Sequence, residues 1–265
     1  MNSHTKNYAL ITGATSGIGY ELAKIFAANH YNLIIVARSS AKLLEIAEDF
    51  SKNYGVQVKP IAKDLFKFKS AFELYDEVQA KGLQVDVLVN NAAQGVYGRF
   101  VDTDIDEELD IIQLNINAYV VLTKFFLKDM VARQDGKILN VASVAGKLPG
   151  PFQSVYHATK AFVHSFTEAI RAETAATGVT ITSLLPGATA TDFFNKAHME
   201  ESKILEQELA DPAKVAADGF NALMRGDDMV ISGFKNKAQV ALSNFIPDSV
   251  VAKATLKQQA PKNAH

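Results

Sequence analysis

Two stretches of the sequence place a tyrosine four residues before a lysine. They are SVYHATKAF, with Tyr156 and Lys160, and GYELAKIF, with Tyr20 and Lys24. Residues four apart share one face of a helix. A positive charge about 4 Å from a phenol is worth roughly 4 kcal/mol at an effective dielectric constant near 20, or about three pKa units. Such a charge would bring the phenol pKa from about 10 to near 7, so either pair suits proton transfer.

The position in the chain separates the two pairs. Tyr20 follows a glycine-rich segment at the start of a predicted helix, so we expect its side chain beside a bound cofactor or against the sheet. Tyr156 lies 13 residues after Ser143, which ends the apolar segment KILNVAS. A serine hydroxyl at a strand end can orient a substrate carbonyl while Tyr156 protonates it. We therefore assign carbonyl chemistry to the Tyr156–Lys160 pair.

Short apolar runs alternate with segments of helical periodicity along the whole chain. The predicted strands cover residues 8–11, 32–37, 56–62, 86–90, 137–142, 179–185 and 229–232. Strands that are apolar on both faces are typical of a parallel sheet covered by helices on each side. The sequence thus predicts one α/β domain over residues 1–265, a Rossmann-type doubly wound parallel sheet of about seven strands. Ligands of such sheets bind beyond the carboxyl ends of the strands.

A glycine-rich loop follows the first predicted strand. In TGATSGIG, residues 12–19, the glycines are Gly13, Gly17 and Gly19. Glycines at such a turn let backbone N–H groups approach a pyrophosphate at a helix N-terminus. The spacing matches neither GxGxxG nor the phosphate loop GxxxxGK[ST], and a simple glycine turn is the alternative. The flanking strand and amphipathic helix favour dinucleotide binding.

The end of the second predicted strand bears on which dinucleotide binds. An NAD-binding site usually places an acid there, on the ribose 2′-hydroxyl. The segment VARSS, residues 36–40, has no carboxylate but contains Arg38, whose guanidinium suits a phosphate. The sequence therefore favours NADP(H) over NAD(H), with a solvated surface arginine as the alternative.

Charge and composition limit the partners. The formal net charge is −2, from 27 basic and 29 acidic residues, and supplies no field to attract nucleic acid or acidic lipid. No signal-peptide pattern and no apolar run of about 18 residues is present, so we expect a cytoplasmic protein without nucleic-acid or membrane partners. The acidic run 102–110 matches only the opening of a calcium loop and is better explained by helix capping; no metal is expected.

Several motifs, in order along the chain, resemble those of the classical short-chain dehydrogenase/reductase (SDR) family. Besides the glycine loop, Asn115 in LNI, Ser143 and the Tyr156–Lys160 pair match the family's catalytic residues, and NNAA at 90–93 resembles NNAG, with Ala93 in place of glycine. The resemblance implies a cofactor site built by the following residues: Gly13, Thr15, Ser16, Gly17, Ile18, Gly19, Arg38, Asp64, Leu65, Asn91, Ala92, Tyr156, Lys160, Pro186, Gly187, Thr189 and Thr191.

The same resemblance implies a mechanism. Hydride passes from NADPH to a ketone or aldehyde held by Ser143 and Tyr156, or back from an alcohol. Tyr156 supplies the proton, Lys160 lowers the tyrosine pKa and binds the nicotinamide ribose, and Asn115 holds a water molecule in a proton relay. The alternative is a protein on the same fold that senses NADP(H) without turnover. The substrate stays open among steroids, sugars, acyl thioesters and other ketones.

Three further segments carry expectations. The connection 192–209 is too long for a tight turn, which predicts a substrate lid with Phe193, Phe194 and Met199 as candidate lining. The helix 106–130 is apolar on more than one face, which predicts a homodimer or homotetramer. Residues 234–265 form a C-terminal extension that would serve as a cap, a partner contact or a frayed end, and His157 is expected to line the site or lie on the surface.

Overall fold

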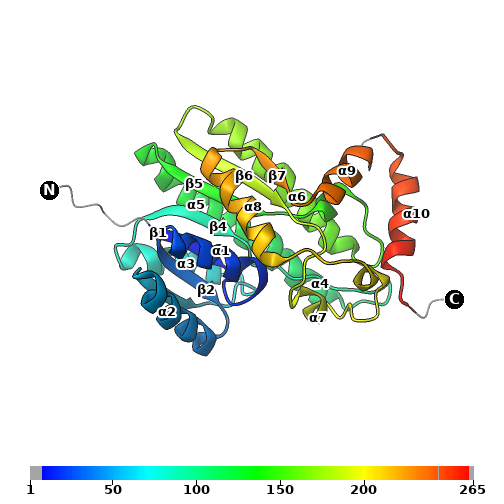
Figure 1. The fold of residues 1–265 in the computed structure, drawn as a ribbon, viewed down its shortest axis with the longest axis horizontal. Helices are drawn as coiled ribbons and strands as arrows, with labels where there is room; N and C mark the ends of the chain where they lie inside the picture. The colour runs from blue at the N-terminus through cyan, green and yellow to red at the C-terminus, as the bar shows by residue number, and fades with distance from the viewer. Residues whose placement is uncertain (1–7, 244, 263–265) are drawn as a thin grey trace.

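A seven-stranded, all-parallel sheet forms the centre of the computed structural model, which describes residues 8–243 and 245–262. The strands lie in the order β3-β2-β1-β4-β5-β6-β7 (Figure 1). Their bounds are β1 Tyr8–Thr12, β2 Asn32–Ala37, β3 Val58–Ala62, β4 Val85–Asn90, β5 Gly136–Val141, β6 Val179–Leu185 and β7 Met229–Ile231. The predicted doubly wound sheet is confirmed.

Helices cover both faces of the sheet. The bounds of the α-helices, including those away from the sheet, are α1 Gly17–Ala28, α2 Ser40–Tyr54, α3 Ser70–Ala80, α4 Ile105–Ile112, α5 Ala118–Arg133, α6 Ser154–Glu173, α7 Phe193–Lys196, α8 Pro212–Arg225, α9 Phe234–Ser243 and α10 Asp248–Gln259. One apolar cluster joins α1, α2 and α8 to the sheet, and a second joins α3 and α5 to the opposite face. In Figure 1, α9 and α10 lie together at one end of the molecule, beyond the sheet.

The predicted helix 106–130 is not continuous. A π-helical turn, Gln113–Asn117, separates α4 from α5 and contains Asn115. Such turns occur frequently at functional sites. On α5, Phe125 stacks on Tyr75 of α3 with ring centroids 4.8 Å apart, so part of the apolar surface predicted as a subunit interface is covered within the chain. The oligomer stays a prediction.

The acidic run 102–110 caps α4 and occupies its first turn, as predicted. The Asp104 carboxylate accepts a hydrogen bond of 2.8 Å from the backbone N–H of Asp106, and three acidic residues occupy the first turn. Acidic side chains there offset the positive end of the helix dipole. The structure thus gives these carboxylates a local role in starting α4.

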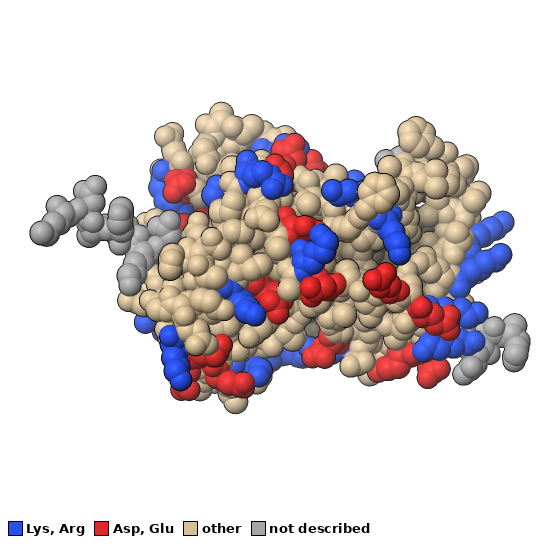
Figure 2. Space-filling view, viewed as in Figure 1, with Lys and Arg blue, Asp and Glu red and all other residues tan. Residues whose placement is uncertain are grey.

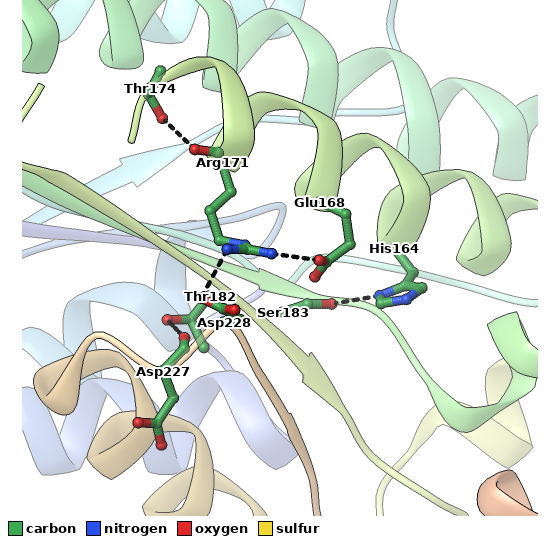
Figure 3. A network of polar contacts seen from close by, with 8 residues as sticks. All are labelled: His164, Glu168, Arg171, Thr174, Thr182, Ser183, Asp227 and Asp228. Carbon is green, nitrogen blue, oxygen red and sulfur yellow. Dashed lines mark hydrogen bonds and ion pairs between the residues drawn. The ribbon is translucent and has the colours of Figure 1, made fainter. Parts of the chain in front are cut away.

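A polar network fixes the C-terminal half of α6 to the neighbouring strand (Figure 3). Arg171 bridges Glu168 at 2.8 Å and Asp228 at 2.9 Å, while the Nδ1 atom of His164 lies 3.3 Å from the Ser183 hydroxyl on β6. These groups hold α6 against the edge of the sheet where β6 pairs with β7. The N-terminal half of α6 is thereby directed along the carboxyl ends of β5 and β6.

Acidic and basic side chains are interspersed with one another on the face in Figure 2. None of the helices in the described ranges is long and apolar enough to cross a membrane.

Candidate active site

A cleft of about 910 Å³ runs along the carboxyl ends of the strands. It includes the point between β1 and β4 where the strand order reverses, which is where doubly wound sheets bind their ligands. Two of the predicted site residues, Asp64 and Asn115, are absent from its lining. The others all line it: Gly13, Thr15, Ser16, Gly17, Ile18, Gly19, Arg38, Leu65, Asn91, Ala92, Ser143, Tyr156, Lys160, Pro186, Gly187, Thr189 and Thr191.

The glycine positions of the loop 12–19 leave no room for side chains. Gly13 and Gly17 have φ angles of +68° and +55°, in the left-handed region that favours glycine. A Cβ atom on Gly17 would lie 2.7 Å from Thr191, and one on Gly19 would lie 2.3 Å from the carbonyl oxygen of Gly13. This close packing leaves a cradle of backbone N–H groups at the start of α1. The cradle fits a dinucleotide pyrophosphate.

Hydrogen bonds tie the glycine loop to the end of β4. The Thr12 hydroxyl accepts from the backbone N–H groups of Asn91 at 2.9 Å and Ala92 at 3.0 Å, and the Asn91 amide donates to the Thr12 carbonyl at 2.9 Å. Ala93 is not among the described residues with positive φ, so the methyl group that replaces the family's glycine needs no strained backbone. The two loops form one wall of the cleft.

The cleft extends to the carboxyl end of β2, where the sequence predicts the adenosine end of the cofactor. Arg38 is exposed there, with its guanidinium carbon 5.3 Å from the centroid of the Phe66 ring. Leu65 lines the cleft. Asp64 does not, and its carboxylate instead accepts a hydrogen bond of 3.3 Å from the Phe66 backbone N–H. The carboxylate of Asp64 therefore orders the Leu65–Phe66 turn.

Tyr156 and Lys160 lie one turn apart on α6, and both line the cleft. Lys160 is only 2% exposed, and its ammonium group donates a hydrogen bond of 2.8 Å to the Val141 carbonyl at the end of β5. That group lies 5.6 Å from the centroid of the Tyr119 ring and 5.9 Å from that of Tyr156. The lysine is thus seated between two phenol rings and the sheet.

Burial controls both pKa values. It lowers the pKa of Lys160 to about 7 and raises the pKa of Tyr156 to about 12, an increase that the Ser143 hydroxyl partly offsets. The sequence argument, in which the lysine charge brings the phenol near pH 7, is wrong for this structure. It placed the two groups about 4 Å apart in a polar medium and omitted the desolvation of both.

Ser143 is held rigidly at the end of β5. Its hydroxyl accepts a hydrogen bond of 3.1 Å from the Ala145 backbone N–H and donates one of 3.2 Å to the Pro186 carbonyl. The first bond caps the short 3-10 helix Val144–Lys147, and the second joins β5 to the end of β6. Ser143 and Tyr156 therefore reach the same cleft from a strand end and a helix.

Asn115 is fully buried behind the cleft, in the π-helical turn. Its amide donates to the Gln94 carbonyl at 2.9 Å and to the Thr159 hydroxyl at 3.0 Å, and its side-chain oxygen accepts from the Gln94 N–H at 3.1 Å. Thr159 in turn donates to the Tyr156 carbonyl at 2.7 Å. Both amide hydrogens are thus used within the protein, so the side chain cannot donate to the water molecule of the expected relay.

The Tyr20–Lys24 pair has a different environment. The Tyr20 ring packs on Phe50 of α2 with centroids 5.5 Å apart, and Lys24 is exposed. Tyr20 packs on the apolar cluster that joins α1 and α2 to the sheet, which agrees with the second of its two expected positions and not with one beside the cofactor. Neither the phenol nor the ammonium lines the cleft.

The segment 192–209 and α10 border the substrate end of the cleft. Phe193 lies 5.0 Å from Tyr156 between ring centroids, and Phe194 also lines the cleft, whereas Met199 packs in a small cluster within the segment itself. His157 is buried and lines the cleft, next to Gln259 of α10. Sequence reasoning missed Gln153 and Gln259 as cleft residues. No motif marks either, and Gln259 lies 102 residues beyond its partner.

Comparisons with known proteins agree with this architecture. The 7B member of the dehydrogenase/reductase SDR family from Mus musculus is 32% identical over 258 residues, which cover 93% of this chain and 76% of that protein. Very-long-chain 3-oxoacyl-CoA reductase from Anas platyrhynchos is 36% identical over 190 residues, 69% of this chain. The match spans only 60% of the length of that reductase.

A solved structure covers nearly the whole chain. The short-chain dehydrogenase from Sphingobium yanoikuyae in complex with NADPH superposes with a TM-score of 0.83 at 25% sequence identity, over 98% of each chain. The family model described as short chain dehydrogenase matches residues 7–202, which include the glycine loop, Ser143 and the Tyr156–Lys160 pair. The chain therefore belongs to the short-chain dehydrogenase/reductase family.

Proposed function

We propose that the protein transfers a hydride between NADP(H) and a carbonyl or secondary alcohol substrate. The observation that supports this best is the convergence of Ser143, Tyr156 and Lys160 on the cleft that begins at the glycine loop. A proton donor, a carbonyl-orienting hydroxyl and a buried cation beside a dinucleotide cradle are the groups that carbonyl reduction requires.

The cofactor end of the cleft fits NADP(H) by its donor groups. The backbone N–H groups of Gly17 and Gly19 at the start of α1 would hold the pyrophosphate, whereas Gly13 donates its N–H to the Val36 carbonyl at 2.8 Å and shapes the turn. Arg38 would bind the 2′-phosphate, and the segment 186–191 would border the nicotinamide. When bound, the cofactor supplies or accepts the hydride. Arg38 supports NADP(H) over NAD(H), because its guanidinium would attract the 2′-phosphate, which the carboxylate typical of NAD sites would repel.

Proton transfer is the part of the reaction that we assign to Tyr156. The phenol donates its proton to the substrate oxygen as the carbonyl becomes an alcohol, while the Ser143 hydroxyl turns its hydrogen from the Pro186 carbonyl to orient that oxygen. A pKa of about 12 keeps the phenol protonated at neutral pH, and it is still a much stronger acid than an alcohol. Reduction can therefore start from the protonated phenol at neutral pH, whereas oxidation needs the phenolate as a base.

Asn115 is a positioning residue in this proposal. Its amide holds Thr159, which holds the backbone carbonyl of Tyr156. It also fixes the Gln94 backbone at the start of the loop after β4. The side chain thus sets the position of the N-terminal turn of α6 without contact with the substrate.

The test is a screen of ketones, aldehydes and 3-oxoacyl thioesters in which oxidation of NADPH is followed by its absorbance. Tyr156→Phe should lower turnover by about 10²- to 10⁴-fold and leave NADPH binding unchanged. Tyr20→Phe is the matched control, since Tyr20 lies outside the cleft, and it should retain activity. Unchanged turnover in Tyr156→Phe would contradict the assignment, and NADPH binding without turnover of any carbonyl would favour the sensor alternative.

A further inference from the structure

Helix α9 presents an apolar surface to solvent. Phe234, Ala238 and Leu242 follow one another at intervals of four residues, so they lie on one face of the helix. All three are exposed, Phe234 to 85% and Leu242 to 61%. Phe245 extends this row past the end of the helix, because its backbone N–H donates to the Leu242 carbonyl at 3.1 Å, and its side chain is 88% exposed. We call these four residues the α9 apolar face.

The opposite face of α9 holds the helix against the rest of the chain. Val240 is only 5% exposed, and the Asn236 amide donates a hydrogen bond of 2.6 Å to the Ser232 carbonyl. This side of the helix contacts the 3-10 helix Val144–Lys147. A surface helix normally turns its apolar side chains to the core. The large apolar side chains of α9 instead point outward, so the α9 apolar face stays uncovered in the described part of the chain.

Exposed lysines accompany the α9 apolar face. Lys235 and Lys237 lie on α9 itself, and Lys253 and Lys257 lie on α10, at the same end of the molecule (Figure 1). Residues 234–262 contain five lysines and one aspartate, which leaves 22 basic and 28 acidic residues for the rest of the chain. The net charge of −2 therefore combines a segment of +4 with a remainder of −6. The charge of the whole chain, which supplies no field to attract acidic lipid, does not describe this segment.

A second exposed apolar cluster has the opposite surroundings. Phe100, Val101, Ile105 and Leu109 are exposed around the start of α4, and the stretch 102–110 contains six acidic residues. A negatively charged partner would be repelled by this cluster and attracted by the α9 apolar face. The two clusters thus separate a merely apolar contact from one that also needs negative charge on the partner.

The α9 apolar face begins at the mouth of the cleft. Phe234 and Lys235 both line the cleft, and the high exposure of Phe234 places it at the rim. A folded protein seated on this face would cover the mouth. A lipid surface would instead bring apolar compounds dissolved in the bilayer to it, and the cleft has the apolar lining of Leu148, Phe193 and Ile204 to receive them.

We propose that α9 and the turn after it bind the surface of an anionic lipid bilayer. Phe234, Leu242 and Phe245 enter the boundary between the head groups and the acyl chains, and the lysines contact the acidic head groups. A lysine suits the edge of such a contact, because its apolar stem can lie along the acyl chains while its ammonium group stays in water. Repulsion of the acidic remainder orients the chain with the cleft mouth towards the bilayer. The binding does not depend on the proposed carbonyl chemistry.

Co-sedimentation with phosphatidylcholine vesicles, prepared with and without phosphatidylserine, tests the proposal. The natural protein should bind the vesicles that contain phosphatidylserine at least about tenfold more tightly, and rising salt should weaken this binding. Phe245→Ser should lower the partition coefficient about tenfold or more, and Lys237→Gln should lower it about fivefold. Phe100→Ser is the matched control, an exposed phenylalanine from the acidic cluster, and it should bind like the natural protein.

Turnover and light scattering separate the other outcomes. Phe245 and Lys237 do not line the cleft, so both variants should turn over a water-soluble carbonyl compound like the natural protein. Unchanged vesicle binding in Phe245→Ser, an equal loss in Phe100→Ser, or binding that does not need phosphatidylserine overturns the lipid contact and leaves the proposed function intact. Binding as expected without turnover of any carbonyl compound contradicts the proposed function alone. A dimer that Phe245→Ser converts to a monomer in the absence of lipid assigns the face to a second copy of the chain and overturns the proposal.

Discussion

Replacement of Lys160 by methionine should stabilise the protein against unfolding in the absence of cofactor. Burial lowers the pKa of this lysine from 10.5 to about 7. Each pKa unit corresponds to about 1.36 kcal/mol, so the folded state carries a cost of about 5 kcal/mol below pH 7. The substitution removes this cost but leaves the Val141 carbonyl without its donor, which costs about 1–3 kcal/mol. The net gain at neutral pH is about 2–4 kcal/mol.

The dependence on pH identifies the cause. Between the folded pKa near 7 and the unfolded pKa of 10.5, the unfolded state binds more protons at Lys160, so the stability of the natural protein rises with pH. From about pH 7 to pH 9 the advantage of Lys160→Met should therefore shrink by about 2 kcal/mol. Tyr156, with a pKa of about 12, does not titrate in this window.

Denaturant unfolding of both proteins at several pH values measures these differences. The control is Lys24→Met, which removes the exposed lysine of the other pair and should give a difference from the natural protein that is the same at each pH. Other titrating groups cancel in the comparison. If Lys160→Met were less stable throughout, or if its advantage did not change with pH, the lysine would not carry the desolvation described above.

Three further outcomes follow from the site and the surface. Arg38→Asp should shift the ratio of kcat/KM for NADPH over NADH towards NADH by about 10- to 100-fold, measured with one carbonyl substrate; an unchanged ratio would refute the 2′-phosphate role. Gly17→Ala combines positive φ with a contact of 2.7 Å to Thr191 and should weaken NADPH binding at least about tenfold. The control Gly82→Ala, at φ +63° with no atom within 4 Å, should lower the stability by only the backbone cost of about 1–2 kcal/mol and leave NADPH binding unchanged. Equal NADPH affinities of the two variants would contradict the cradle. Light scattering at micromolar concentration should give a dimer or tetramer, and a monomer would contradict the predicted interface.

The sheet was accessible from sequence because local signals and tertiary environment agree along it. The run 179–185 is apolar, rich in β-branched residues and bounded by Gly178 and Pro186, and its predicted limits are those of β6. The segment 106–130 is a counter-example. Its periodicity is helical throughout, but Asn115 bonds to the Gln94 backbone, and the helix widens into a π turn there. That contact joins residues 21 positions apart and leaves no periodic signal.

The residues of the site likewise divide into those that a local sequence pattern marks and those that only tertiary contacts place there. Ser143 and Tyr156 were found because a strand end and a helix start are visible in sequence, and parallel topology brings such ends together. The direction of the pKa shifts was not accessible, since it depends on how completely the chain excludes water from Lys160. Gln259 was missed as a cleft residue because its position depends on contacts with Tyr97, Ser202 and His157, which only the folded chain brings together.

The desolvated lysine and the buried glutamines of the cleft, Gln153 and Gln259, share one physical property. Each is a polar group whose burial is incompletely compensated within the protein, and each lines the same cleft. In the core, by comparison, the Asn140 amide on β5 is bonded to Thr167 at 3.0 Å. Lys160 differs from unpaired buried atoms outside the cleft, such as the Asn90 side-chain oxygen, because it lies where a bound cofactor or substrate would offer it a partner. Lys160 lies in the part of the chain that the family model matches, whereas α10 lies beyond it. We therefore expect the proton-transfer step to depend on the matched region of the chain.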